Sequence, residues 1–246
     1  MTEAPPELAA EPTASRRWGL GDVVLGFTIG LTGSQIALAG ILSATGRSVE
    51  QVDELPLSLV AVAQLGLWFG LLGVPLVATR LKGNGIVADL HLRARLGDAW
   101  RGGVIGVLLQ LAALPLLYWP LLNLLHKTAS DLEGPARAMT DRADGPVGVI
   151  LLVLIVGIGA PVVEEIFYRG LFQGALLKRG LPPVAAVAIS ATVFGLSHGE
   201  LLQLPALVLF GAVAGTLAYR AGRLGPAIAA HVAFNMVTVI SLLAAR

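Results

Sequence analysis

The sequence predicts an all-α fold, a polytopic transmembrane helical bundle with about seven spans. Apolar residues make up 55% of the 246 residues and charged residues only 13%, against about 45–50% and about 25% in soluble domains. The charges are clustered in short stretches that leave long apolar windows between them. Each window approaches the roughly 20 apolar residues that a helix needs to cross the hydrocarbon core of a bilayer.

The apolar windows follow one another along the chain with short polar connections. Residues 1–17, rich in Pro, Ala and Glu, lack apolar periodicity and are predicted to be a disordered tail rather than a signal peptide. Three spans fall within residues 18–146, and residues 147–246 form a four-span core. The fifth and sixth windows are short and nearly touch. The seven windows are 21–44, 57–79, 102–125, 147–169, 183–199, 201–220 and 226–244.

The distribution of Lys and Arg predicts the orientation, because basic residues collect in cytoplasmic loops. With the N-terminus inside, cytoplasmic segments hold 11 of the 17 basic residues and the opposite side holds 5. We therefore expect a cytoplasmic N-terminus. The Ala-, Gly- and Arg-rich composition favours a bacterial plasma membrane. Four tryptophans are expected to be interfacial anchors: Trp18, Trp68, Trp100 and Trp119.

Charge and cysteine content exclude several function classes. The formal net charge of +1 implies no basic surface for nucleic acid. The chain has no cysteine, which excludes disulfides, thiolate zinc sites and a cysteine nucleophile.

Polar side chains inside the predicted spans are concentrated in the C-terminal half of the chain. An ionisable residue within a span costs at least ~2.5–3.5 kcal/mol on insertion scales, so each is a functional candidate. The fourth span carries three of them, the fifth ends with one, and the seventh carries a histidine and an amide. These residues are Glu164, Glu165, Arg169, His198, His231 and Asn235.

The spacing of these residues predicts how they face one another. Glu165 and Arg169 are four residues apart with the acid first, the favourable order for an ion pair on one helix face. Glu164 lies about 100° around the helix from Glu165, so the two carboxylates need not share a role. His231 and Asn235 are also four residues apart and project from one face.

Hydrolysis is a chemistry that such a set can perform. A carboxylate and an imidazole that share a water can act as base and acid. A second imidazole and a carboxamide can donate hydrogen bonds to an oxyanion. Two Glu and two His could instead be zinc ligands. The HExxH pattern of zinc peptidases and the GxSxG turn of serine hydrolases are both absent. The residues are therefore compatible with hydrolysis with or without a bound metal.

Two other function classes can use the same buried polar residues. An ion-coupled transporter would line its pathway with them, although no internal repeat pairs the two halves of the chain. A non-catalytic membrane scaffold or immunity protein would retain the fold without the chemistry. Each pair also has a purely structural interpretation, in which Glu165 with Arg169 is an ion pair and His231 with Asn235 joins helices by hydrogen bonds.

Three motifs, in order on three apolar helices, resemble a known family. EEIFYR at 164–169 fits EExxxR, FGLSH at 194–198 fits FxxxH, and HVAFN at 231–235 fits HxxxN. The chain is similar here to the CPBP family of CAAX proteases and bacteriocin-processing enzymes, also called Abi, related to type II CAAX prenyl endopeptidases. The resemblance covers about residues 147–244.

The resemblance implies an intramembrane endopeptidase and a role for each motif residue. It implies a peptide or protein substrate at the bilayer, which could be lipidated, and no certain cofactor. Members are often called metalloproteases, while a metal-free glutamate mechanism is argued for the prenyl endopeptidases. By motif position, the resemblance implies that Glu164 with His198 activates water and that His231 and Asn235 bind the oxyanion. Glu165, Arg169 and Phe194 are the supporting residues. If zinc is present, its ligands are Glu164, His198 and His231.

Helix lengths set a condition for these groups to converge. Glu164 and His198 are each about 17 residues from a turn near Gly180, whereas His231 is only about 6–9 residues from the next turn. At 1.5 Å per residue these distances are roughly 25 Å and roughly 9–13 Å. We expect the 165–190 hairpin to project past the membrane surface, with Arg169, Lys178 and Arg179 at the interface and the site open to the cytoplasm.

Overall fold

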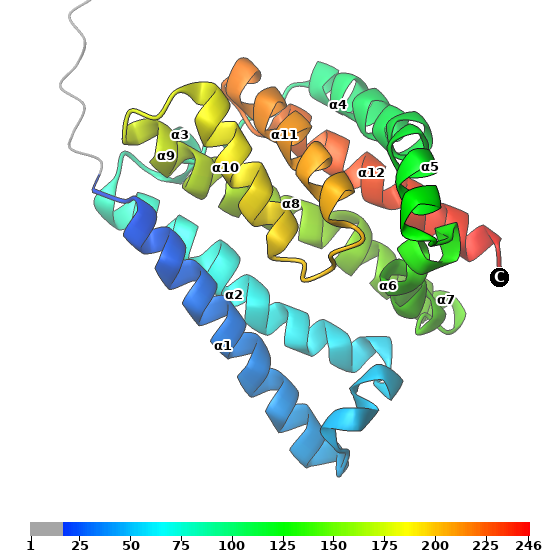
Figure 1. Ribbon diagram of the computed structural model, residues 1–246. Helices are drawn as coiled ribbons and strands as arrows, with labels where there is room; N and C mark the ends of the chain where they lie inside the picture. The colour runs from blue at the N-terminus through cyan, green and yellow to red at the C-terminus, as the bar shows by residue number, and fades with distance from the viewer. Residues whose placement is uncertain (1–16) are drawn as a thin grey trace, which may run out of the picture.

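The computed structural model describes residues 17–246, and all regular structure in that range is helical (Figure 1). The predicted all-α fold is confirmed. The predicted tail, apart from Arg17, lies outside the described residues. The helices before the core are α1 (Leu20–Thr45), η1 (Val49–Glu54), α2 (Leu57–Lys82), α3 (Ile86–Asp89), α4 (Leu96–Leu108), η2 (Leu109–Ala113), α5 (Leu114–Leu125) and α6 (Ala129–Asp141).

The C-terminal core contains one long composite helix and three simple ones. The composite helix begins at Gly145, ends at Lys178 and is about 50 Å long at 1.5 Å per residue. Its parts and the helices after it are α7 (Gly145–Leu152), η3 (Val153–Gly159), α8 (Ala160–Glu164), η4 (Glu165–Gln173), α9 (Gly174–Lys178), α10 (Pro183–Leu196), α11 (Leu204–Ala221) and α12 (Gly225–Ala244).

Within residues 17–246, six helices are long and apolar enough to cross a membrane. They correspond to six of the seven predicted windows, and the protein is an integral membrane protein. The remaining window is α10, which is apolar but has only 14 residues. The six are Leu20–Thr45, Leu57–Lys82, Leu96–Leu125, Gly145–Lys178, Leu204–Ala221 and Gly225–Ala244.

Helices α1 and α2 form an antiparallel hairpin on one side of the core (Figure 1). Their backbones touch where glycines face each other. A Cβ on Gly70 would overlap the backbone of Gly30, and a Cβ on Gly66 would overlap that of Gly33. Close backbone approach through small residues is the usual way membrane helices pack, because lipid provides no hydrophobic force between them.

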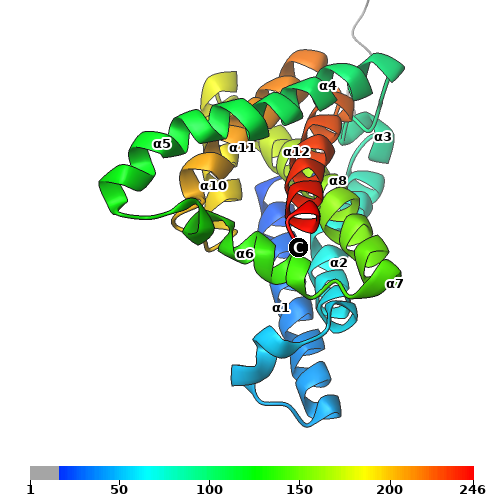
Figure 2. The ribbon, with the colours of Figure 1, turned by 90° about the vertical axis from the view of Figure 1, so that its right-hand side faces the viewer.

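The composite helix packs against α10, α11 and α12, while α4 and the π-helical segment η2 contact α12 (Figure 2). Phe167, Phe194 and Phe210 are fully buried where these helices meet. Helix α4 approaches α12 through Gly102 and Gly106, which lie against the α12 backbone. This packing brings α12 close to the middle of the composite helix.

Three segments within the long helices are π-helical: η2, η3 and η4. Pro115 and Pro161 follow η2 and η3 within two residues. Proline has no N–H to donate to the carbonyl four residues earlier, so the helix is locally widened there. A proline within an apolar span is expected to kink the helix where neighbours satisfy the freed carbonyl. Pro205 differs from these two, because it occupies the first turn of α11, where no such bond is lost.

Two tryptophans differ from the expectation of interfacial anchoring. Trp100 and Trp119 are exposed, as a lipid-facing or interfacial ring must be. Trp18 is buried with 2% exposure, and its indole Nε1 donates to Asp89 at 3.0 Å. Trp68 packs against Gly159 in the core, because that glycine leaves space for its ring. Indole rings fill core space as readily as interfaces.

Candidate active site

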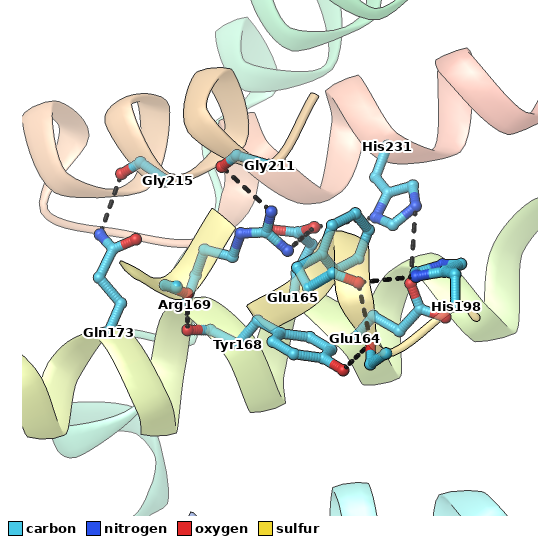
Figure 3. Close-up of polar contacts among 12 residues, drawn as sticks. Glu164, Glu165, Tyr168, Arg169, Gln173, His198, Gly211, Gly215 and His231 are labelled. Atoms are coloured by element: carbon cyan, nitrogen blue, oxygen red, sulfur yellow. Dashed lines mark hydrogen bonds and ion pairs between the residues drawn. The ribbon is translucent and has the colours of Figure 1, made fainter. Parts of the chain in front are cut away.

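The three motifs meet at the middle of the composite helix (Figure 3). Glu164 ends α8 and Glu165 begins η4. His198 lies just past α10, and His231 lies in the second turn of α12. Residues far apart in the sequence are thus brought to one buried level of the bundle.

Their convergence depends on the composite helix extending past its neighbour. Glu165 lies 13 residues before Lys178, the end of α9, and His231 lies 6 residues after Gly225, the start of α12. These are about 20 Å and about 9 Å along the two helices. The composite helix and the α9–α10 turn therefore reach about 10 Å beyond the start of α12, as the predicted projecting hairpin requires.

Glu165 and Arg169 form the predicted ion pair, in which Nη1 donates to Oε1 at 2.9 Å. Both side chains are completely buried. Arg169 also donates through Nη2 to the carbonyl of Gly211 at 3.2 Å, and its guanidinium carbon lies 4.5 Å from the ring centroid of Phe194. Arg169 is therefore a core residue, and the expectation that it lies at the membrane interface is wrong. The carboxylate and the aromatic faces supply the partners that a buried guanidinium needs.

His231 lies between the two glutamates (Figure 3). Its Nδ1 is 2.8 Å from Oε1 of Glu165, and its Nε2 is 3.8 Å from Oε2 of Glu164. Since an ionised carboxylate only accepts hydrogen bonds, the Glu165 contact assigns a proton to Nδ1. The side chain of Glu165 has no exposed surface, whereas that of Glu164 keeps 17%. The two carboxylates therefore differ in environment, as their positions on the helix predicted.

His198 is oriented by its own helix. Its Nδ1 lies 2.8 Å from the carbonyl oxygen of Phe194. A carbonyl only accepts, so Nδ1 carries the proton and the neutral ring has its lone pair on Nε2. The Phe194 ring centroid is 4.7 Å from that of His198 and 5.8 Å from that of His231. Phe194 thus packs against both histidines, and this contact is how it would support the site.

Asn235 faces the composite helix one turn further along α12. Its Nδ2 donates to the carbonyl of Val156 at 2.8 Å, within the π-helical segment η3. His231 and Asn235 therefore do project from one face of α12, and both contact the same partner helix. One amide hydrogen of Asn235 is used in this bond, and the other is left for a different acceptor.

Further polar residues support the site and were not singled out in the sequence. The Tyr168 hydroxyl and Ser197 Oγ are 2.6 Å apart, and Ser190 Oγ donates to the Tyr168 carbonyl at 3.0 Å. Gln173 Nε2 donates to the carbonyl of Gly215 at 3.0 Å. Gln173 follows Arg169 by four residues, and a polar stripe of that spacing on an apolar helix could have identified it.

The predicted metal ligands do not form a ligand set in this arrangement. Among residues 17–246, no three His, Asp or Glu groups converge closely enough to hold a metal ion. Glu164 and His231 approach each other, but His198 does not join them in a group close enough to share an ion. The residues present therefore do not fit a bound zinc as they stand, and no step below is derived through a metal.

Residues 146–237 match the family described as type II CAAX prenyl endopeptidase Rce1-like. The matched range contains all three motifs, and the resemblance predicted from them is confirmed for this part of the chain. The chain matches no curated protein and no solved structure.

Proposed function

We propose, on the premise that residues 146–237 match the type II CAAX prenyl endopeptidase family, that this integral membrane protein is an intramembrane endopeptidase. It hydrolyses a peptide bond in a membrane-associated peptide or protein. The observation that carries the proposal is the position of His231 between Glu164 and Glu165 in a buried part of the bundle. A packing role alone gives no reason to place two carboxylates at one imidazole.

We assign His231 the role of oxyanion donor. Its Nδ1 is 2.8 Å from Glu165 Oε1, and its Nε2 lies 3.8 Å from Glu164 Oε2. The Glu165 contact fixes the ring, so that Nε2 faces the carboxylate at which we place the reacting water. With hydrogen on Nε2, His231 can donate it to a developing oxyanion.

We assign the bond-making steps to Glu164 and His198. A water hydrogen-bonded to Nε2 of His198 gives a proton to the Glu164 carboxylate, and its oxygen attacks the scissile carbonyl carbon. The oxyanion accepts a hydrogen bond from His231 Nε2 and from the remaining amide hydrogen of Asn235. Glu164 then returns the proton to the leaving nitrogen as the C–N bond breaks. The products are a carboxylic acid, which gives its proton to the amine or to water on release, and an amine, and the enzyme groups are restored.

Glu165 and Arg169 act as positioning residues in this scheme. Glu165 holds His231 through Nδ1, and Arg169 compensates the charge of Glu165. The substrate class is a peptide at the bilayer, and a prenylated CAAX peptide is the first candidate because of the family match. We place the protein in a bacterial plasma membrane with the N-terminus cytoplasmic, on the basis of composition and the distribution of Lys and Arg.

The test is cleavage of a peptide panel by the detergent-purified chain. The panel includes a farnesylated CAAX peptide and the same peptide without the lipid. Glu164→Gln keeps the shape of the side chain but removes the base, and general bases contribute about 10²–10⁴-fold. Cleavage should fall by at least that factor, while Glu200→Gln, an exposed loop variant, should cleave as wild type. Full activity of a folded Glu164→Gln protein would contradict the proposal.

The same assay decides whether a metal takes part. Loss of activity with a chelator, restored by zinc, would assign a metal site that forms only with bound ion or substrate. Unchanged activity with the chelator would support the metal-free glutamate mechanism.

A further inference from the structure

A basic cavity lies at the end of the bundle where α1 begins and where α2 and α9 end. Figure 1 shows these three helix ends gathered at one corner of the molecule. The cavity has a volume of about 560 Å³. Among residues 17–246, four cationic side chains and one carboxylate line it: Arg17, Lys82, Lys178, Arg179 and Asp22.

Only part of this positive charge is compensated within the protein. Lys82 forms an ion pair with Asp22 at 2.6 Å. Lys178 lies 3.8 Å from the ring centroid of Trp18 and donates to its carbonyl. The exposed side chains of Arg17 and Arg179 make no hydrogen bond or ion pair in the part of the chain that the structure describes. The cavity therefore offers two uncompensated guanidinium groups to an anion.

An apolar groove continues from this cavity along α1 and α2. It has a volume of about 320 Å³ and shares Asp22, Leu25 and Lys82 with the basic cavity. Its other walls are apolar or glycine: Ile29, Phe69, Gly73, Val74, Val77 and Ala78. The groove runs from the charged helix ends toward the middle of the hairpin, because Ile29 lies seven residues, or about 10 Å, further along α1 than Asp22.

We propose that the cavity and the groove together bind one anionic phospholipid, with the headgroup phosphate in the basic cavity and an acyl chain in the groove. The order of the two parts matches the polarity of a lipid in a bilayer, charged at the interface and apolar further in. Lys and Arg near a membrane surface attract anionic lipids, and a planar guanidinium binds phosphate through two hydrogen bonds. Arg179 is 14 residues from Glu165, so this site is separate from the proposed active site.

The headgroup part is tested with the full chain in detergent, by measuring the affinity for phosphatidylglycerol and for phosphatidylcholine of the same acyl chains by native mass spectrometry. Each Lys or Arg near an anionic surface contributes about a fivefold preference. The double variant Arg17→Gln/Arg179→Gln should therefore bind phosphatidylglycerol about 25-fold more weakly. Arg80→Gln/Arg101→Gln removes two exposed cations that do not line the cavity and should bind as wild type.

The groove part is tested with two matched glycine variants. A Cβ at Gly73 or at Gly40 meets no atom within 4 Å, so Gly73→Leu and Gly40→Leu should both fold. Gly73→Leu fills the groove and should weaken phosphatidylglycerol binding several-fold, whereas Gly40→Leu should leave it unchanged. Equal affinity of wild type for the two lipids would overturn the proposal. So would displacement of the lipid by inorganic phosphate together with wild-type affinity of Gly73→Leu, because the site would then take a free anion.

Discussion

Replacing Arg169 with methionine should strongly destabilise the protein, because it leaves the Glu165 carboxylate in the core without its cation. Neither side chain of this pair has any exposed surface, and Glu165 Oε2 has no hydrogen-bond partner. Breaking a buried ion pair by removing one partner costs about 3–5 kcal/mol. We expect the lower end of that range, since His231 Nδ1 still contacts Glu165 at 2.8 Å.

The chain contains a matched control for this substitution. Glu133 and Arg137 form an ion pair with the same residue types, the same order and the same spacing, but both side chains are 43% exposed. Exposed pairs of this kind contribute about 0.3–0.5 kcal/mol. Arg137→Met should therefore change the free energy of unfolding by less than about 1 kcal/mol, so the difference between the two variants isolates burial.

Equilibrium unfolding in mixed detergent micelles measures both variants, and the double variant Glu165→Gln/Arg169→Met provides a second reading. Removing the charge from Glu165 removes the reason for the loss, so the double variant should be more stable than Arg169→Met alone. Equal destabilisation by Arg169→Met and Arg137→Met would refute the reasoning, as would a double variant that is less stable than Arg169→Met.

Three further substitutions test particular contacts. Gly70→Val places a side chain against the α1 backbone and should lower the free energy of unfolding by about 1–3 kcal/mol. Its control, Gly73→Val, faces open space and should change this free energy little. Equilibrium unfolding in detergent measures both. Asn235→Ala removes the bond to the Val156 carbonyl and should cost about 1–3 kcal/mol; an unchanged midpoint of thermal unfolding would contradict this contact. Tyr118→Phe removes a hydroxyl that donates to the Leu202 carbonyl at 2.7 Å and should speed amide hydrogen exchange at residues 197–206. Unchanged exchange at these residues would show that the hydroxyl does not stabilise this loop.

Much of the fold could be predicted because apolar windows and membrane thickness are tightly linked. Each long span in the structure has a counterpart among the windows, and the i,i+4 spacing of Glu165 and Arg169 predicted a contact that depends on one helix alone. The position of α10 was also predicted, but not that it is only 14 residues long. An apolar window of 17 residues contains no signal for the turn at residues 197–203, where the backbone leaves the helix to place His198.

The parts that could not be predicted depend on contacts between helices. The placement of His231 between two carboxylates follows from the way Gly102 and Gly106 let α4 press on α12, and from the depth at which α12 starts. The burial of Arg169 depends on the Gly211 carbonyl and the Phe194 ring, which lie on other helices. The bond between Asn235 and Val156 joins two helices: Pro161 marks the distortion of the composite helix, but no sequence pattern indicates that a carbonyl there meets Asn235.

The water-activating role of Glu164 is tested most directly by one turnover of a cleaved substrate in H₂¹⁸O, with enzyme in excess. If Glu164 deprotonates a water that attacks the scissile carbonyl, the new carboxyl group of the product must contain one ¹⁸O atom. If Glu164 instead attacks the carbonyl itself, an anhydride forms, and water that opens it at the Glu164 carbon leaves the label in Glu164 and the product unlabelled. Mass spectrometry of the product and of the peptide containing Glu164 distinguishes the two, and label in the protein would contradict the mechanism proposed here.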